Sequence, residues 1–359
     1  MSKENYNVVG VMSGTSLDGI DLAHIKFSIT DNVWTFEIGK CETVAYSRQW
    51  VARLKSAVDY NAEELNDLNS DYTFLLGNTI KSFISDIENL DAVCSHGHTI
   101  LHQPQNGYTL QIGNLPEIAN IIGITIVCDF RVSDVKLGGQ GAPLVPIGDR
   151  ILFPDYDYCL NLGGFANVSY EAEGKRIAFD ISAVNTVLNH YANSFGKAYD
   201  DKGSIAASGK RNELLLQQLN GLKYYKMAYP KSLGFEYVKK TLLPLMETFS
   251  IPVEDKMHTF CEHVAVQISE ALPLPTGKLL ITGGGAYNDF LTGLIQHHLP
   301  DMTISIPGQK ILEYKEALIF ALLGVLKLRG EINVLSSVTG ARHDHSSGFV
   351  YGCGNNEIT

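Results

Sequence analysis

Residues 10–21 read Gly-Val-Met-Ser-Gly-Thr-Ser-Leu-Asp-Gly-Ile-Asp, and this stretch sets how the chain begins to fold. The apolar run Val8–Met12 leads into it and the alternating segment Asp21–Ile29 leaves it, a pattern typical of two strands joined by a tight polar turn. Val33–Glu42 is a third expected strand. The beginning of the chain therefore predicts a sheet built from neighbouring strands.

Helices and further strands follow this start. Apolar residues recur at helical spacing between residues 61 and 90, and Ala92–Cys94 and Ile124–Cys128 are expected buried strands. Three early strands followed by helices that alternate with strands predict an α/β fold with a mixed sheet covered by helices.

A second start of the same kind lies near the middle of the chain. Tyr158–Leu162 runs into Gly163 and Gly164, and expected strands follow at Asn167–Tyr170 and Ile177–Phe179. The remaining expected elements are helices at residues 182–195, 210–220, 232–248, 255–271 and 313–328 and a strand at 278–281. We infer a duplicated topology without a duplicated sequence; two unrelated hairpins are the alternative.

Length and charge restrict the kind of protein. The 359 residues favour two domains, and 28 basic against 39 acidic residues give a net charge of −11, which argues against nucleic acid as a partner. The first ten residues contain no apolar segment of the kind found in signal peptides, so we expect no signal peptide. The longest apolar run, Ala317–Leu326, is half of a membrane span, so we expect no membrane partner. Six scattered cysteines without a CxxC pair indicate reduced thiols and a cytoplasmic location.

Of the 33 glycines, several cluster at residues 10–19, 138–141, 163–164 and 283–285, and three of these clusters form turns at expected strand ends. Backbone N–H groups of the first turn could approach phosphate oxygens, and Asp18 and Asp21 could orient Mg²⁺. An ordinary hairpin turn has the same composition and is the alternative. Two further turns, in residues 161–169 and 281–289, have the same character, and none of the three matches a P-loop or a GxGxxG dinucleotide motif.

Two charged residues stand at expected strand ends. Asp180 follows an apolar strand, where it is either a general base or the cap of the next helix. Arg131 could hold a carboxylate with two parallel hydrogen bonds, or form a surface ion pair with Asp129 or Asp134.

A His-x-His pattern, His96 and His98, also stands at a strand end. Such a pair can ligate a metal ion, as in metal-dependent hydrolases, but the chain shows no further residues that complete the site. Histidines that form hydrogen bonds at a ligand site are the favoured interpretation.

Taken in order, these segments resemble the anhydro-N-acetylmuramic acid kinases, a family within the sugar kinase, Hsp70 and actin superfamily. The resemblance runs from residue 8 to about residue 342. Its segments are GVMSGTSLDGID, SHGHT, LQIGN, DFR, GGQGAPLVP, NLGGFANVS, PKSLG, TGGGAYN and SVTGAR.

The resemblance implies an actin-like ATPase architecture of two ribonuclease H-like α/β domains around an interdomain cleft. We expect domain I at residues 1–130 and 340–359 and domain II at 131–339. The implied ATP-binding residues are Gly14, Thr15, Ser16, Leu17, Asp18, Gly19, Ile20 and Asp21 at the first phosphate turn, Gly163, Gly164 and Asn167 at the second, and Gly283, Gly284 and Gly285 near the adenosine. Asp18 is the implied Mg²⁺ ligand.

The implied reaction uses ATP and water to open the ring of 1,6-anhydro-N-acetylmuramate and to phosphorylate O6, which gives N-acetylmuramate 6-phosphate and ADP during cell-wall recycling. By resemblance Asp180 is the base that deprotonates water, and Glu316 is a second catalytic candidate. The implied sugar-binding residues are His96, Thr99, Gln111, Arg131 and Asp180. A homodimer is implied as well.

One segment departs from the family. The family reads DTGPGN where this chain has Asp180-Ile181-Ser182-Ala183-Val184-Asn185. Bulky residues replace a Gly/Pro turn, so a related sugar kinase with a shifted substrate and a non-catalytic sugar or nucleotide sensor stay open as alternatives. An early start of the following helix would make the replacement harmless.

Overall fold

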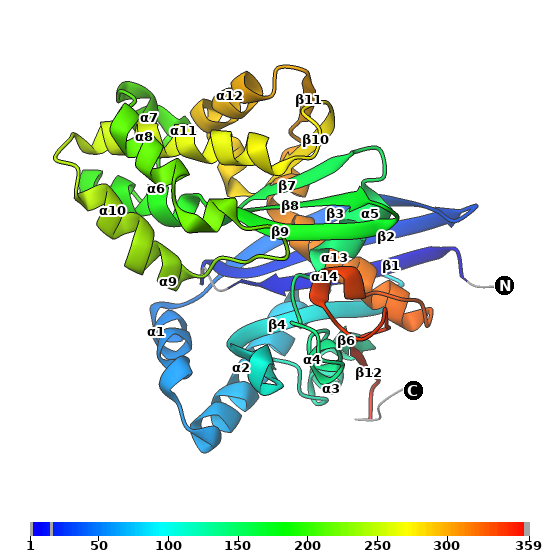
Figure 1. Cartoon of the computed structure of the whole chain (residues 1–359). Coiled ribbons are helices and arrows are strands. Elements are labelled where there is room, and N and C mark those ends of the chain that lie inside the picture. Colours follow the sequence, from blue (N-terminus) through cyan, green and yellow to red (C-terminus); the bar gives the residue numbers. More distant parts are fainter. Residues whose placement is uncertain (1–2, 15–16, 355–359) are drawn as a thin grey trace. The chain divides into compact units, whose positions relative to one another are not determined.

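The computed structural model describes residues 3–14 and 17–354, and the chain divides into two compact units. Unit 1 comprises residues 1–152 and 314–359, and unit 2 comprises residues 153–313 (Figure 1). Segments 131–152 and 314–339 thus belong to unit 1, whereas the sequence led us to expect them in domain II. The domain boundaries that the resemblance implies, between residues 130 and 131 and between residues 339 and 340, remain a prediction.

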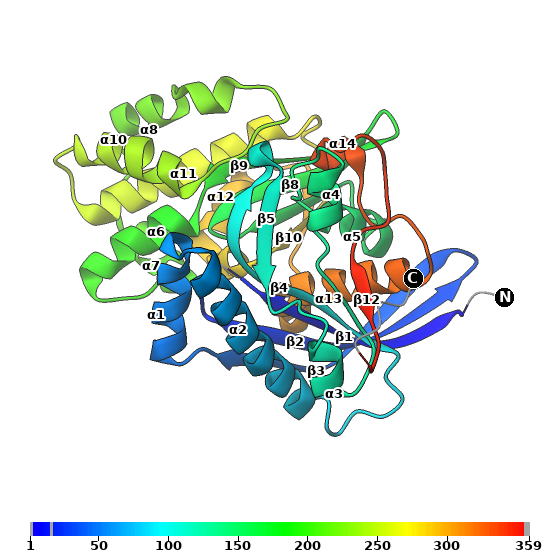
Figure 2. The same cartoon turned by 90° about the horizontal axis from the view of Figure 1, so that it is seen from below.

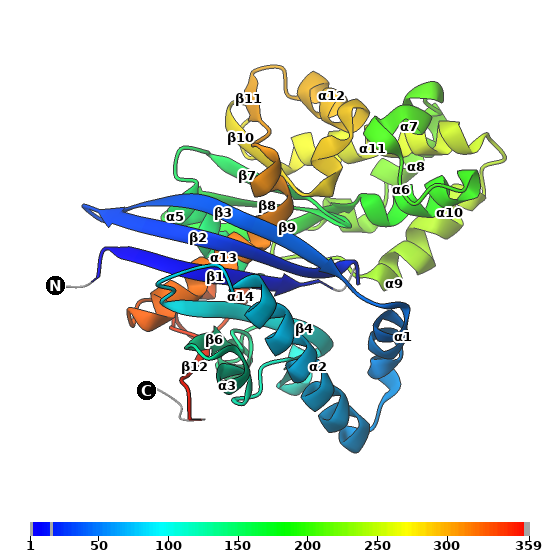
Figure 3. The same ribbon diagram turned by 180° about the vertical axis from the view of Figure 1, so that it is seen from behind.

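Unit 1 contains a seven-stranded mixed sheet in the order β12-β6-β4-β1-β2-β3, with β5 paired to β4. The strands β1, β2 and β3 are antiparallel neighbours, and β4 and β6 continue the sheet in parallel beside β1 (Figure 3). The strands are β1 (Asn5–Ser13), β2 (Gly19–Thr30), β3 (Val33–Ala45), β4 (Ala92–Gln103), β5 (Tyr108–Ile112), β6 (Ile126–Cys128) and β12 (Phe349–Tyr351).

Helices cover both faces of this sheet. On one face lies α2 (Figure 2), whose Leu68, Leu76 and Ile80 pack with Val9 and Leu22 of the strands. A Cβ at Gly10 would lie 1.9 Å from the Ala317 carbonyl oxygen, so α13 packs directly against β1 on the other face. The helices are α1 (Arg48–Ser56), α2 (Ala62–Phe83), α3 (Ile118–Ile122), α4 (Val132–Lys136), α5 (Val145–Leu152), α14 (Ser336–Thr339) and α13 (Gln309–Leu328), of which the residues from Tyr314 onward belong to unit 1.

Unit 2 contains a five-stranded sheet in the order β11-β10-β7-β8-β9. The three strands that come first in the sequence, β7, β8 and β9, are again antiparallel neighbours, and β10 and β11 continue the sheet in parallel. This arrangement repeats the order β6-β4-β1-β2-β3 of unit 1. The strands are β7 (Tyr158–Leu162), β8 (Phe165–Ala172), β9 (Lys175–Ala183), β10 (Gly277–Thr282) and β11 (Met302–Ser305). The expected duplication of topology and the α/β fold class with mixed sheets flanked by helices are confirmed.

The helices of unit 2 bury one continuous apolar core with this sheet. They are α6 (Asn185–Ala192), α7 (Ser204–Ser208), α8 (Glu213–Asn220), α9 (Phe235–Tyr237), α10 (Leu243–Glu247), α11 (Val253–Ala271) and α12 (Asp289–His298), with a π-helical turn at Val238–Leu242. In the part of the chain that the structure describes, no helix has both the length and the apolar character needed to cross a membrane.

Candidate active site

The first glycine turn follows β1 in unit 1. The N–H of Leu17 donates to the Gly14 carbonyl oxygen at 3.3 Å, and Leu17 is left-handed, with φ of 62°, which is rare for residues other than glycine. Asp18 is exposed, whereas Ile20 is buried and can offer only its backbone to a ligand. Thr15 and Ser16 lie outside the described residues.

A buried cluster of hydroxyls and an imidazole holds the end of β1 immediately before this turn. Ser13 Oγ lies 2.8 Å from His98 Nδ1 and 2.5 Å from the Tyr46 hydroxyl, and the Tyr72 hydroxyl donates to Ser13 Oγ at 3.0 Å. Burial lowers the pKa of His98 to about 4, so its ring is neutral at physiological pH. Sequence reasoning missed this cluster because Tyr46 and Tyr72 come from distant segments without a motif.

His96 and Arg131 form a defined pair. Arg131 Nε donates to His96 Nε2 at 2.8 Å, so the other ring nitrogen of His96 carries the proton and donates to the Gly97 carbonyl oxygen at 2.9 Å. Burial, and then the Arg131 charge, hold the pKa of His96 well below its usual value. Both nitrogens of this ring are occupied, which explains why the His-x-His pattern does not build a metal site.

Arg131 also interacts electrostatically with two carboxylates, those of Glu316 and Asp134. Burial lowers the pKa of Arg131 to about 10, while Glu316 and Asp134 oppose that shift. Desolvation raises the pKa of Glu316; the charges of Arg131 and Lys315 act against this effect, and that of Asp21 adds to it. The structure therefore brings Arg131, Glu316 and Asp21 into one electrostatic neighbourhood of unit 1.

Thr99 and Gln111 lie opposite each other on β4 and β5. Gln111 Nε2 donates to Thr109 Oγ1 at 2.8 Å and to Thr99 Oγ1 at 3.3 Å. Its Oε1 is buried and has no hydrogen-bond partner among the described residues. A buried acceptor without a partner is costly, which makes this amide a suitable receiver for a donor group of a ligand.

The two glycine turns of unit 2 lie against each other. Gly283 has φ of 84°, and a Cβ there would lie 2.4 Å from Asn161 Oδ1 and 2.9 Å from the Leu162 carbonyl oxygen. The Gly164 carbonyl oxygen accepts the Val184 N–H at 2.9 Å, so the turn at Gly163 and Gly164 is also fixed to the start of α6. Predicted residues that lie far apart in the sequence thus gather at the end of β7.

Asp180 lies in a polar row that crosses three strands. Asn161 pairs with Asn167 between β7 and β8, and Asn167 pairs with Asp180 between β8 and β9. Because directly paired residues of antiparallel strands share a face, Asn167 and Asp180 point to the same side of the sheet. One row therefore joins an expected ATP-binding amide to the expected base.

The Asp180 carboxylate is held by one hydrogen bond. Its Oδ2 accepts the Leu233 N–H at 2.9 Å, and its backbone N–H donates to the Lys231 carbonyl oxygen at 3.2 Å. Burial raises the pKa of Asp180, and the bond from Leu233 partly opposes the increase. Asp180 is not a helix cap, because β9 continues through Ala183 and α6 begins at Asn185.

The segment Ile181–Val184 is buried in the core of unit 2. The prediction of a helix at residues 182–195 is wrong at its start, because β9 continues to Ala183 and α6 begins at Asn185. None of residues 181–184 has a positive φ, so this backbone needs no glycine. The departure from the Gly/Pro turn is therefore accommodated by a longer strand rather than by an early helix.

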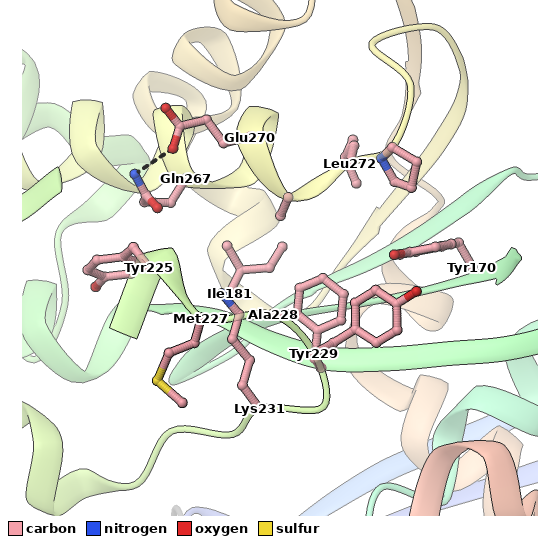
Figure 4. Close-up of a pocket in the computed structure, with 13 residues that line it drawn as sticks. Tyr170, Ile181, Tyr225, Met227, Ala228, Tyr229, Lys231, Gln267, Glu270 and Leu272 are labelled. Carbon is pink, nitrogen blue, oxygen red and sulfur yellow. Dashed lines mark hydrogen bonds between the residues drawn. The ribbon is translucent and has the colours of Figure 1, made fainter. Parts of the chain in front are cut away.

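A hollow of about 290 Å³ adjoins the loop that holds Asp180 (Figure 4). Phe179 and Ile181, which precede and follow Asp180, line it, and the ring of Tyr229 stacks on Phe179 with centroids 5.6 Å apart. No residue expected in the site lines this hollow. Asp180 and the hollow are thus separate features that share the loop 227–233.

No three His, Cys, Asp or Glu side chains within residues 3–14 and 17–354 are grouped so that they could hold a metal ion. His343 and His345 also belong to no such group; His345 Nε2 lies 3.6 Å from Asp134 Oδ1. The metal-hydrolase interpretation therefore has no donor set in this part of the chain.

Comparison with known proteins gives a consistent picture. A family model described as anhydro-N-acetylmuramic acid kinase matches residues 6–353. The anhydro-N-acetylmuramic acid kinase of Saccharophagus degradans is 34% identical and aligns over 96% of this chain and 98% of its own. That of Vibrio cholerae is 33% identical over 96% and 97%. Among solved structures, a ROK family glucokinase from Streptomyces griseus in complex with glucose and AMPPNP covers 89% of this chain and 99% of its own, with 10% identity and a TM-score of 0.41.

Proposed function

The chain belongs to the anhydro-N-acetylmuramic acid kinase family, and from that premise we propose which of its residues bind and transform the substrates. It is an ATP-dependent sugar kinase, a phosphotransferase with an alcohol group as acceptor. Neither the shifted-substrate kinase nor the non-catalytic sensor is favoured by its relatives, which share one name.

We propose that Asp180 is the general base. One oxygen of its carboxylate accepts the Leu233 N–H, and the other has no hydrogen-bond partner among the described residues, so it can take a proton from water. Burial raises its pKa and so makes it a stronger base than an exposed aspartate. This half-occupied carboxylate within β9, three residues before the strand ends, is the observation that carries the proposal.

The reaction then follows from one deprotonation. Water loses a proton to Asp180, and its oxygen bonds to the anomeric carbon while the anhydro bond to O6 breaks. O6 attacks the γ-phosphorus of ATP, and ADP leaves. Phosphoryl transfer depends mainly on positioning and on neutralising charge.

ATP is held by backbone groups rather than by a basic surface. In unit 2, the paired glycine turns, with Asn167 beside them, present such groups. In unit 1, the described residues Gly14 and Leu17–Asp21 also carry them. Mg²⁺ would accompany the nucleotide and neutralise phosphate charge. Because Mg²⁺ usually needs only one or two protein carboxylates beside phosphate oxygens, the exposed Asp18, with Asp21 in support, suits that task.

Arg131 is the proposed partner of the lactyl carboxylate of the sugar. Two of its five N–H groups are used by described residues, one by His96 and one by the Gly141 carbonyl oxygen. Because both of these partners, the Gly141 carbonyl at 2.6 Å and the His96 ring at 2.8 Å, are neutral groups, the remaining N–H groups of Arg131 suit an anionic ligand. Thr99 and Gln111 are proposed to bind the polar edge of the sugar.

Glu316 is proposed as the second catalytic group. Desolvation raises its pKa above the ordinary value, as is common for carboxylates that take part in proton transfer. A homodimer, a cytoplasmic location and a role in cell-wall recycling belong to the same proposal.

The proposed function is tested by ADP release in the presence of the anhydro sugar. We expect ADP to form only when ATP, Mg²⁺ and 1,6-anhydro-N-acetylmuramate are all present, and mass spectrometry to find one N-acetylmuramate 6-phosphate for each ADP. Free N-acetylmuramate is the control for the anhydro bond. Equal ADP release with and without sugar would contradict the proposal.

A further inference from the structure

A fully buried carboxylate of unit 1, that of Asp134, plays no part in the reaction described above. Its Oδ2 accepts the Gly141 N–H at 2.6 Å, and its Oδ1 accepts the Thr339 hydroxyl at 2.7 Å. His345 Nε2 lies 3.6 Å from the same Oδ1. The carboxylate therefore joins the loop Leu137–Gly141 to the distant α14.

The backbone strengthens this junction. The Gln140 N–H donates to the Thr339 carbonyl oxygen at 2.8 Å, and the Arg342 N–H donates to that of Leu137 at 3.2 Å. Gly139 leaves room for the carboxylate, because a Cβ there would lie 2.2 Å from Asp134 Oδ2. The glycines of this loop thus let it close around Asp134.

The loop in turn holds Arg131. The Gly141 carbonyl oxygen accepts an Nη1 hydrogen of Arg131 at 2.6 Å, while the N–H of the same Gly141 is bound by Asp134. Thr339, Asp134, Gly141 and Arg131 therefore form one continuous chain of hydrogen bonds. Because Gly141 is the direct partner of Arg131 in this chain, its displacement would rotate the Arg131 guanidinium.

We propose that Asp134 and Thr339 are positioning residues for the carboxylate-binding subsite of the enzyme: by fixing Gly141 they orient Arg131 toward the lactyl group of the sugar. This inference rests on the proposed function. It assigns to the SVTGAR segment a role in selecting a sugar that carries a carboxylate, rather than in binding ATP.

The test compares two sugars that differ only in the lactyl group, 1,6-anhydro-N-acetylmuramate and 1,6-anhydro-N-acetylglucosamine. Thr339→Val keeps the volume of the side chain and removes the hydroxyl that Asp134 accepts. We expect it to weaken binding of the lactyl sugar about tenfold, because a buried acceptor loses its donor and the Gly141 loop relaxes. Binding of the second sugar and of ATP should change less than twofold.

Three controls separate positioning from general damage. Thr339→Ser, which restores the hydroxyl, should restore discrimination between the sugars. Thr259→Val removes an equally buried hydroxyl in unit 2, where Thr259 donates to the Asp255 carbonyl oxygen at 2.6 Å, and should leave discrimination unchanged. In an Arg131→Ala background, Thr339→Val should have no further effect on the lactyl sugar.

Equal weakening for both sugars, or an undiminished effect in the Arg131→Ala background, would overturn the inference. If Thr339→Val unfolds at the assay temperature, Thr339→Ala is measured in the cold with the same two sugars and the same criteria. Failure of the proposed function looks different, because the unmodified enzyme itself would then not bind the lactyl sugar.

Discussion

Asp180 shows how a single carboxylate can be prepared for its task by its surroundings. No cation is paired with it among the described residues, so burial rather than a charged neighbour dominates its pKa and raises it. The Leu233 N–H fixes one oxygen and leaves the other for a proton. The proposed base thus combines a place on β9, a hydrogen bond from a loop amide and partial burial.

Asp180→Asn should lower kcat by about 10²–10⁴-fold, the usual contribution of a general base, because an amide cannot take a proton from water. ATP binding, measured by calorimetry, should remain within about twofold. Full turnover by the variant would remove Asp180 as the base. In the unmodified enzyme the base must be ionised, so kcat/KM should fall as pH falls, with a midpoint above the ordinary aspartate value of about 3.9. A profile that stays flat down to pH of about 4 would contradict the raised pKa.

The residues of the sugar side could be named from the sequence, but not their chemical state. His96 and Arg131 stand in recognisable segments, yet the proton on Nδ1 of His96 follows only from its contacts with Gly97 and Arg131. Tyr46 and Tyr72 carry no motif, and they meet Ser13 only once β1, the end of β3 and α2 have packed. Side-chain state and cross-element clusters depend on tertiary contacts that no local pattern encodes.

At the scale of elements, the glycine turns were predictable and their contact was not. Glycine-rich strand ends are visible in the sequence, whereas the contact of Gly283 with Asn161 joins β10 to β7 across more than a hundred residues. Three short strands, β5, β11 and β12, were not foreseen, because edge strands of three to five residues show too little alternation.

Gly283→Ala should weaken ATP binding about tenfold or more, since alanine is strained at φ of 84° and its Cβ would press on Asn161 and Leu162. The matched control is Gly284→Ala, where a Cβ would meet nothing within 4 Å and φ is not positive. Titration of both variants with a nucleotide analogue gives the two affinities. Equal affinities would argue against a fixed glycine turn at the adenosine side.

The difference from the family motif at residues 181–184 also concerns how the elements pack. Ile181 and Val184 are among the buried residues of the unit 2 core, so their bulky side chains are accommodated there. Asp180 stays in the half-buried polar row with Asn167.

At the scale of the whole molecule, two sheets with the same strand order account for most of the chain. The order could be inferred from two similar strand–turn–strand starts because the connections between neighbouring strands are short. The resemblance implied that residues 340–359 return to the first domain, whereas residues 314–339 could be placed in unit 1 only through contacts such as that of Gly10 with Ala317. Long-range contacts of this kind leave no periodic signal.

The composition also acquires a physical meaning at this scale. A net charge of −11 does not attract an anionic nucleotide, and we propose that backbone N–H groups and Mg²⁺ supply the attraction instead. The glycine-rich turns would present these N–H groups, whereas Arg131 is proposed to bind the carboxylate of the sugar.

The central claim is that water attacks the sugar and not the phosphate, and labelled water tests it most directly. In H₂¹⁸O with ATP, Mg²⁺ and 1,6-anhydro-N-acetylmuramate, we predict one ¹⁸O atom at the anomeric hydroxyl of the sugar 6-phosphate and none in any phosphate. Unlabelled N-acetylmuramate 6-phosphate kept in the same water measures spontaneous exchange. Label in phosphate, with an unlabelled anomeric oxygen, would contradict the account.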